Sequence, residues 1–75
     1  MSNMRELAPG QVWAWSMKHD ARYVILLVSH VRDQRWNVLV VYSERLGDPS
    51  LVGTVLIENL CAIANGTSPR WRRLV

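Results

Sequence analysis

The chain has 75 residues, which is enough for one domain and no more. Hydrophobic residues make up 49% of it, so the composition excludes an intrinsically disordered segment. The formal net charge of +3 is local, because the six basic and six acidic groups of residues 1–58 cancel and Arg70, Arg72 and Arg73 remain. This balance excludes a basic field over the whole surface and predicts a basic cluster at the C-terminal end.

Residues 1–8 read as an N-terminal lead-in, and Pro9-Gly10 is a turn signal that begins a single domain over residues 9–75. No segment carries a secretory signal core or an apolar run long enough to cross a bilayer. Cys61 is the only cysteine, so an internal disulfide is excluded and a reducing compartment is expected. These features together predict a cytoplasmic protein.

A first strand is predicted directly after the turn, where Trp13 and Trp15 alternate with Val12, Ala14 and Ser16. Successive side chains of a strand point to opposite faces, so the two tryptophans share one face. Trp13 is expected to fill the core, as is Trp36 further along the chain. Residues 17–21 are short and polar and connect this strand to the next segment.

Residues 22–43 form two runs rich in β-branched and aromatic residues, which predicts a long antiparallel hairpin. A turn centred between Asp33 and Gln34 places large apolar residues opposite one another on one face, which is the expected core face. The expected opposed pairs are Val31 with Trp36, Leu27 with Val40, and Ile25 with Tyr42. A longer loop would shift this register, because Asp-Gln lacks the glycine that a tight hairpin turn prefers.

The second face of the hairpin is also apolar in its middle. It carries five aliphatic residues, namely Val24, Leu26, Val28, Leu39 and Val41. An open sheet with one wet face does not place so many aliphatics on the wet side. We therefore expect this face to be covered by the same sheet as it curls, by another element, or by a second copy of the chain.

The C-terminal part alternates loops with short elements. Residues 44–50 read as a loop, a fourth strand is expected near Val52–Ile57, and residues 59–64 fit a short helical turn about as well as a strand. Residues 70–74 read as a last strand with Trp71 and Arg73 on one face. The predicted fold is mainly β, either a small five-stranded barrel or a strongly bent antiparallel meander with one helical turn near residues 59–64.

This order of elements resembles the small SH3-like barrel, in which a helical turn precedes the last of five strands. The opening Pro9-Gly10-Gln11-Val12-Trp13 and the closing Arg70-Trp71-Arg72-Arg73-Leu74 also resemble short accessory proteins encoded by phages and other mobile elements. The resemblance implies a macromolecular partner in a bacterial host, which such a protein inhibits or redirects, and a location in the host cytoplasm. It carries over no ligand type, because the acidic loop and aromatic groove of peptide-binding SH3 domains are not found.

Catalysis is not expected from this sequence. His19 and Asp20 are adjacent in a short polar loop, where a base and its orienting group are rarely held in a preformed site. The plasmid-toxin ribonucleases share a related barrel and a similar first strand, but their catalytic residues have no clear counterpart here. No ligand spacing for a metal and no glycine-rich phosphate loop occur, so neither a metal nor a cofactor is predicted.

A binding role is therefore predicted, with a protein partner favoured. The residues expected to contact that partner are Trp15, Arg35, Trp71, Arg72 and Arg73, since Trp and Arg are enriched in binding hot spots. A first alternative is nucleic-acid binding, in which Arg70, Arg72 and Arg73 contact phosphates and Trp71 stacks on a base. A second alternative is a homodimeric structural or assembly protein, because a second copy would also cover the excess apolar surface.

Overall fold

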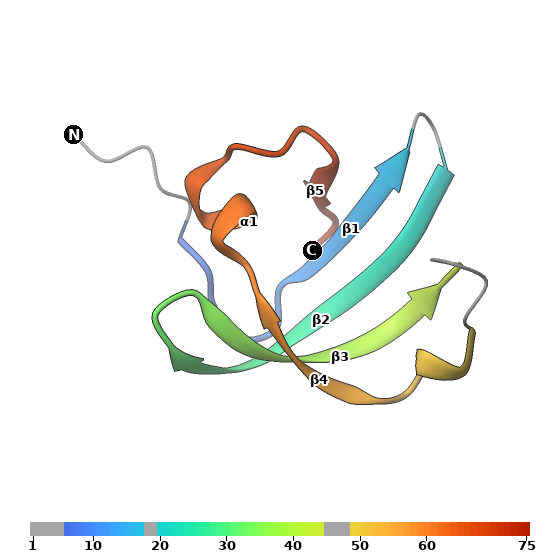
Figure 1. Ribbon diagram of the computed structural model, residues 1–75, viewed down its shortest axis with the longest axis horizontal. Coiled ribbons are helices and arrows are strands. Elements are labelled where there is room, and N and C mark those ends of the chain that lie inside the picture. Colours follow the sequence, from blue (N-terminus) through green and yellow to red (C-terminus); the bar gives the residue numbers. More distant parts are fainter. Residues whose placement is uncertain (1–5, 18–19, 45–48) are drawn as a thin grey trace.

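The computed structural model describes residues 6–17, 20–44 and 49–75 (Figure 1). The elements in chain order are five strands, one 3₁₀ turn and one short helix. Their bounds are β1 Val12–Met17, β2 Asp20–Arg32, β3 Arg35–Ser43, η2 Pro49–Leu51, β4 Val55–Asn59, α1 Cys61–Asn65 and β5 Trp71–Arg73. The predicted mainly β fold with a single helical turn is confirmed, and residues 61–65 are helical rather than extended.

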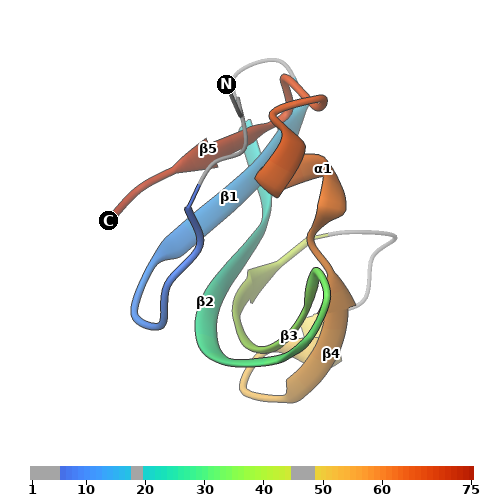
Figure 2. The ribbon, with the colours of Figure 1, turned by 90° about the vertical axis from the view of Figure 1, so that its left-hand side faces the viewer.

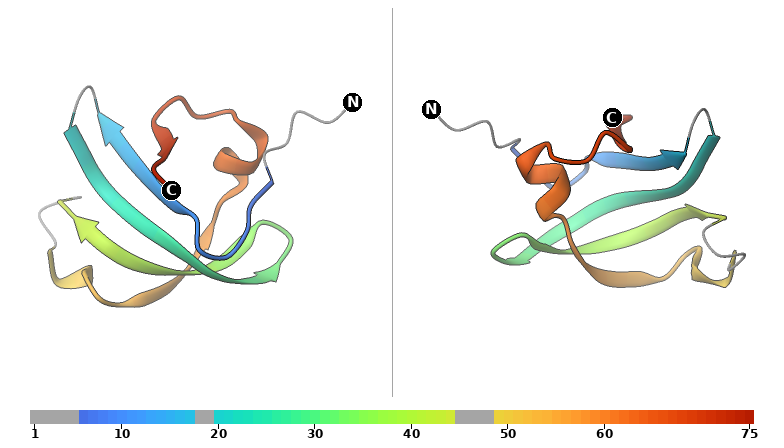
Figure 3. Two further views of the ribbon diagram at one scale, coloured as in Figure 1. Left: turned by 180° about the vertical axis from the view of Figure 1, so that it is seen from behind. Right: turned by 45° about the horizontal axis from the view of Figure 1, so that its top comes forward.

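The five strands form one antiparallel sheet in the order β4-β3-β2-β1-β5. The sheet is open, because β4 and β5 lie at its two edges and do not pair with each other. The prediction of a closed barrel is therefore not confirmed. The long strands β2 and β3 bend strongly, so that the sheet curls and α1 lies on its concave side (Figure 2). The views from behind and from above show the same open arrangement (Figure 3).

The hairpin turn is where the sequence predicted it, since Arg32 pairs with Arg35 and Asp33 takes a positive φ of 50°. The predicted register beyond the turn is wrong. Leu27 lies opposite Val38 rather than Val40, and Ile25 lies opposite Val40 rather than Tyr42. The register changes because the β2–β3 ladder contains three irregularities, each of which leaves one extra residue on one strand.

The extra residues at these three bulges are all valines. Val28 and Val31 are the unpaired residues of β2, and Val41 is the unpaired residue of β3. Their exposed fractions are 44%, 43% and 47%. A bulge bends its strand and reverses the alternation beyond it, which explains why Val31 and Tyr42 are exposed although the simple register placed them on the core face. The same bending curls the sheet.

The core lies on the concave face of the sheet. Nine buried side chains form it: Trp13, Tyr23, Ile25, Leu27, Trp36, Val38, Val40, Leu60 and Ile63. The expected core roles of Trp13 and Trp36 are thus confirmed. Leu7, from the N-terminal lead-in, also packs against this cluster, so residues 6–8 take part in the packing of the domain. Residues 1–5 of the lead-in lie outside the described part.

Helix α1 covers one end of the core through Leu60, Ile63 and Ala64, which are all buried. A helix of five residues is not stable by itself, so this packing holds it in place. Gly66 ends it in the left-handed region with φ 65°; its N–H donates to the Ile63 carbonyl, and the Thr67 N–H donates to the Ala62 carbonyl. Just before it, β4 begins at Val55, three residues later than predicted, because Gly53 takes a positive φ of 86° in the preceding turn.

The convex face is covered only in part by the described residues. Val24 is 8% exposed, between its cross-strand neighbours Ala14 and Tyr42, whereas Val28 and Val41 are solvent-exposed. Among the described residues no second layer packs on this side of the sheet. The sheet curls toward its concave side and does not fold back over its convex face. The expectation that the same sheet would cover this face is therefore not met.

Ser43, at the end of β3, is 3% exposed, and its hydroxyl has no hydrogen-bond partner among the residues that the structure describes. An unsatisfied buried hydroxyl costs about 1–3 kcal/mol in lost hydration. We therefore expect Ser43→Ala to raise the free energy of unfolding by about 1 kcal/mol, which corresponds to a melting temperature roughly 4–8 °C higher for a domain of this size. Thermal unfolding followed by circular dichroism checks this, and an unchanged or lower melting temperature would contradict it.

Candidate functional site

Strands β1 and β5 bring together three of the residues predicted to bind a partner. Trp15 pairs with Trp71, and two positions further along the ladder Trp13 pairs with Arg73. Because alternate residues share a face, all four side chains lie on the concave side of this strand pair. Trp15 and Trp71 are partly buried against the core, whereas Arg73 is exposed. The expectation that Trp71 and Arg73 share a face is met.

Arg70 directly precedes Trp71 in the sequence, and its side chain lies against the ring of Trp15. Its guanidinium carbon lies 6.0 Å from the centroid of the Trp15 ring, within the range of a cation–π contact. Its carbonyl accepts a hydrogen bond of 2.9 Å from the Ser16 N–H. The Trp71 ring meets the edge of Tyr23, with centroids 6.3 Å apart and an interplanar angle of 69°. These contacts hold the aromatic rings in defined orientations at the rim of the core.

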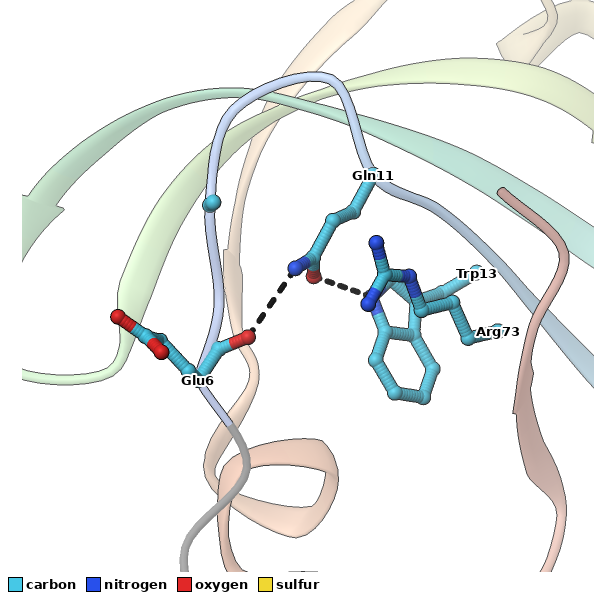
Figure 4. A pocket seen from close by; sticks show the side chains of 5 residues that line it. Glu6, Gln11, Trp13 and Arg73 are labelled. Atoms are coloured by element: carbon cyan, nitrogen blue, oxygen red, sulfur yellow. Dashed lines mark hydrogen bonds between the residues drawn. The ribbon is translucent and has the colours of Figure 1, made fainter.

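A pocket of about 550 Å³ opens beside Trp13. It is lined by Glu6, Ala8, Gln11, Trp13 and Arg73 (Figure 4). Figure 4 shows the Arg73 side chain beside the indole of Trp13, with the Glu6 carboxylate pointing away from both. The Nε of Arg73 donates to the carbonyl of Val75 at 2.9 Å, which orients the guanidinium. The pocket thus combines a positive charge, an amide and an aromatic surface.

Gln11 holds the wall of this pocket in place. Its amide oxygen accepts a hydrogen bond of 3.0 Å from Nε1 of Trp13, and its amide nitrogen donates to the carbonyl of Glu6 at 3.1 Å. Its main chain pairs with Leu27 at 2.9 Å, so the side chain is anchored to β2 at the same point. Gln11 is almost fully buried. A buried glutamine with both ends bonded fixes the N-terminal segment against the sheet.

Two of the predicted site residues lie elsewhere. Arg72 is paired with Ala14 and therefore lies on the convex side of β5, opposite to Arg73. Arg35 is exposed beside the β2–β3 turn, where it pairs with Arg32 and Asn59. That turn is at the opposite end of β2 from Tyr23, which contacts Trp71. Of the five residues predicted to bind a partner, Trp15, Trp71 and Arg73 therefore lie together on the concave side. Arg72 lies on the convex side, and Arg35 lies at the far end of the hairpin.

We call the residues Trp15, Arg70, Trp71 and Arg73, together with the pocket beside Trp13, the β1–β5 site. Sequence reasoning missed Gln11 and Tyr23, which position its rings. Gln11 directly precedes the first strand and gave no signal beyond its place in that motif. Tyr23 packs against Trp71, and its hydroxyl donates to Oε1 of Glu58 at 3.1 Å. Both partners are distant in sequence, so Tyr23 gave no signal either.

Other reactive side chains of the described residues have local roles. Nε2 of His30 is 2.7 Å from the carbonyl of Asp33, and its ring packs on Trp36 with centroids 5.1 Å apart. Sγ of the exposed Cys61 accepts a hydrogen bond from the amide of Asn65. Within residues 6–17, 20–44 and 49–75, no group of three or more His, Cys, Asp or Glu side chains is placed to hold a metal ion. His19 lies outside this part.

None of the helices in the described part of the chain is long and apolar enough to cross a membrane. Comparisons of the chain with protein-family models, with curated proteins and with solved structures found no match.

Proposed function

We propose that this domain is a noncatalytic protein-binding module that uses the β1–β5 site. The observation that supports this most is the grouping of Trp15, Trp71 and Arg73 on one face of a single strand pair, beside an open pocket and with the Arg70 guanidinium over the Trp15 ring. Tryptophan and arginine are the residues that most often dominate protein interfaces, especially next to a pocket that receives a partner side chain. The Arg73 guanidinium favours a partner segment that places a carboxylate in that pocket.

The resemblance to accessory proteins of phages and mobile elements extends the proposal to the kind of partner. Such a protein acts in the cytoplasm of a bacterial host, on a host protein that it inhibits or redirects. A binding surface is sufficient for this activity, and no reaction is required of the domain itself. The proposal therefore assigns no catalytic residue and no cofactor.

The division of the arginines favours a protein over a nucleic acid. A phosphate backbone is bound by basic groups along one continuous track, whereas Arg72 and Arg73 lie on opposite sides of β5. Trp71 is also partly covered by Tyr23, which leaves less of its ring for base stacking. We expect no retention of single- or double-stranded DNA or RNA at low salt in gel-shift assays. Retention that the double variant Arg72→Ala/Arg73→Ala abolishes would favour the nucleic-acid alternative instead.

Capture from a lysate of the bacterial host tests the proposal, with two arginine variants compared side by side. We expect a host protein that the immobilised wild-type domain and Arg35→Ala retain and that Arg73→Ala loses. Arg35→Ala is the matched control, because it removes the same charge from an exposed strand position far from the site. Nuclease treatment of the lysate should leave the capture unchanged. A partner lost equally from both variants, or retained by Arg73→Ala, would contradict the proposal.

A further inference from the structure

The edge strand β4 presents unpaired backbone groups in a regular pattern. Leu60 N–H donates to the Gln34 carbonyl and Val40 N–H to the Thr54 carbonyl, each at 2.8–2.9 Å. In an antiparallel ladder the bonded residues alternate, so the even-numbered residues from 54 to 60 direct their N–H and C=O groups toward β3. Val55, Ile57 and Asn59 therefore direct theirs away from the sheet. No described strand pairs with β4 on that side (Figure 1).

The two edges of the sheet differ in how they are protected. Strand β5 is three residues long and contains two arginines, a combination that discourages pairing with another chain. Strand β4 has the sequence Val-Leu-Ile-Glu-Asn, with no proline, lysine or arginine. Its outward-facing Val55 and Ile57 are 58% and 63% exposed. An apolar edge strand without such protection is a template for adding a further strand.

We propose that β4 pairs antiparallel with β4 of a second copy of this chain, around a two-fold axis at Leu56. In this register Val55 lies opposite Ile57 of the second copy and exchanges both backbone hydrogen bonds with it, using groups that none of the described strands bonds. By symmetry, Ile57 pairs in the same way with Val55 of the second copy. The two Leu56 side chains meet on the concave face. Each cross-strand pair at the centre is apolar, the kind of pair that stabilises a sheet.

A second copy fits this edge because the strand is complementary to itself. The axis at Leu56 places Glu58 opposite Thr54 of the second copy, so no like charges face each other. It also extends a row of cross-strand apolar neighbours on the convex face, in which Val12 pairs with Leu26, Leu26 with Leu39, and Leu39 with Val55. That row continues into Ile57 of the second copy. The dimer would thus provide part of the cover that the convex face lacks.

Five residues span only about 17 Å, so this interface is smaller than the roughly 800 Å² per partner of a standard interface. The dimer is therefore reversible, with a dissociation constant in the micromolar range. Sedimentation velocity of the full chain, from micromolar to near-millimolar concentration, should show a monomer–dimer equilibrium. Over the same range, amide exchange of Val55 and Ile57 should slow with concentration, while that of Leu56 and Glu58 should not change.

The variant Ile57→Pro tests the pairing directly. The N–H it removes points away from β3, so the sheet of the chain itself loses no hydrogen bond, and proline is tolerated at such an edge position. We expect dimerisation at least about tenfold weaker, because two of the four bonds between the copies are lost. Ile57→Lys should have a similar effect through charge on the edge. Circular dichroism and the melting temperature verify that each variant is folded.

Val28→Lys is the matched control, since it places the same charge on an exposed valine of the convex face away from the edge. We expect it to leave the dimer intact. A chain that is monomeric at every concentration overturns the proposal, as does a dimer that Val28→Lys disrupts and Ile57→Pro does not. Capture of a host protein through the β1–β5 site is tested separately, because β4 lies at the opposite edge of the sheet.

Discussion

Trp13→Ala is expected to unfold most of the protein at 37 °C. Trp13 is 3% exposed and belongs to the core cluster, and truncating a buried tryptophan costs about 3–5 kcal/mol. The variant also leaves the Gln11 amide oxygen without the indole N–H that it accepts, which adds the cost of an unsatisfied buried group. A loss of this size is comparable with the whole stability of a small domain. Chemical denaturation followed by tryptophan fluorescence measures it.

Trp13→Phe separates the two contributions. It keeps a six-membered aromatic ring and removes the pyrrole part of the indole with the N–H that donates to Gln11, so we expect a smaller loss of about 1–3 kcal/mol. The single variant Gln11→Leu removes the acceptor and also the bond from its amide nitrogen to the Glu6 carbonyl, so the double variant Trp13→Phe/Gln11→Leu should lose less stability than the sum of the two single variants. A Trp13→Ala protein as stable as the wild type would show that the indole is not part of the core.

Trp15→Ala is expected to weaken binding of the captured host protein by about 30-fold or more, which is roughly 2 kcal/mol. Trp15 is only partly buried; it pairs with Trp71 across β1 and β5, and the guanidinium of Arg70 lies over its ring. The variant removes the central aromatic surface of the β1–β5 site and the ring over which Arg70 is positioned. Isothermal titration calorimetry with the purified partner measures the change.

The control for Trp15→Ala is the stability of the same variant. Because Trp15 is half-buried where Trp13 is enclosed, the free energy of unfolding should fall by less than in Trp13→Ala. Trp15→Phe should restore part of the affinity through its remaining aromatic surface. If Trp15→Ala binds the partner as well as the wild type while remaining folded, the β1–β5 site is not where the partner docks.

The strands were predictable because their signals are local. Alternating large apolar residues placed the first strand, and two long β-branched runs placed the hairpin and its turn at Asp33-Gln34. Residues 59–64 fitted a helical turn and a strand about equally well, and the structure shows a helix over Cys61–Asn65. The middle of the hairpin was not predictable, because a bulge at Val28, Val31 or Val41 has no signature of its own: valine suits a paired and an unpaired strand position equally well.

The site was predictable only in its residue types. Tryptophan and arginine near the C-terminus indicated binding, but their grouping depends on β5 returning to pair with β1. That pairing places Arg72 and Arg73 on opposite faces of β5, although they are neighbours in the sequence. It also brings Gln11 and Tyr23 to the site from segments that carry no binding motif.

The sequence by itself determined the class of fold, the number of strands and the core roles of Trp13 and Trp36, since these follow from alternation and composition within short windows. Only the tertiary structure decided that the sheet stays open, which arginine shares a face with which tryptophan, and which backbone groups of β4 remain unpaired. The physical reason is that register and edge exposure arise from contacts between strands distant in sequence. One extra residue in either strand reverses the faces beyond it.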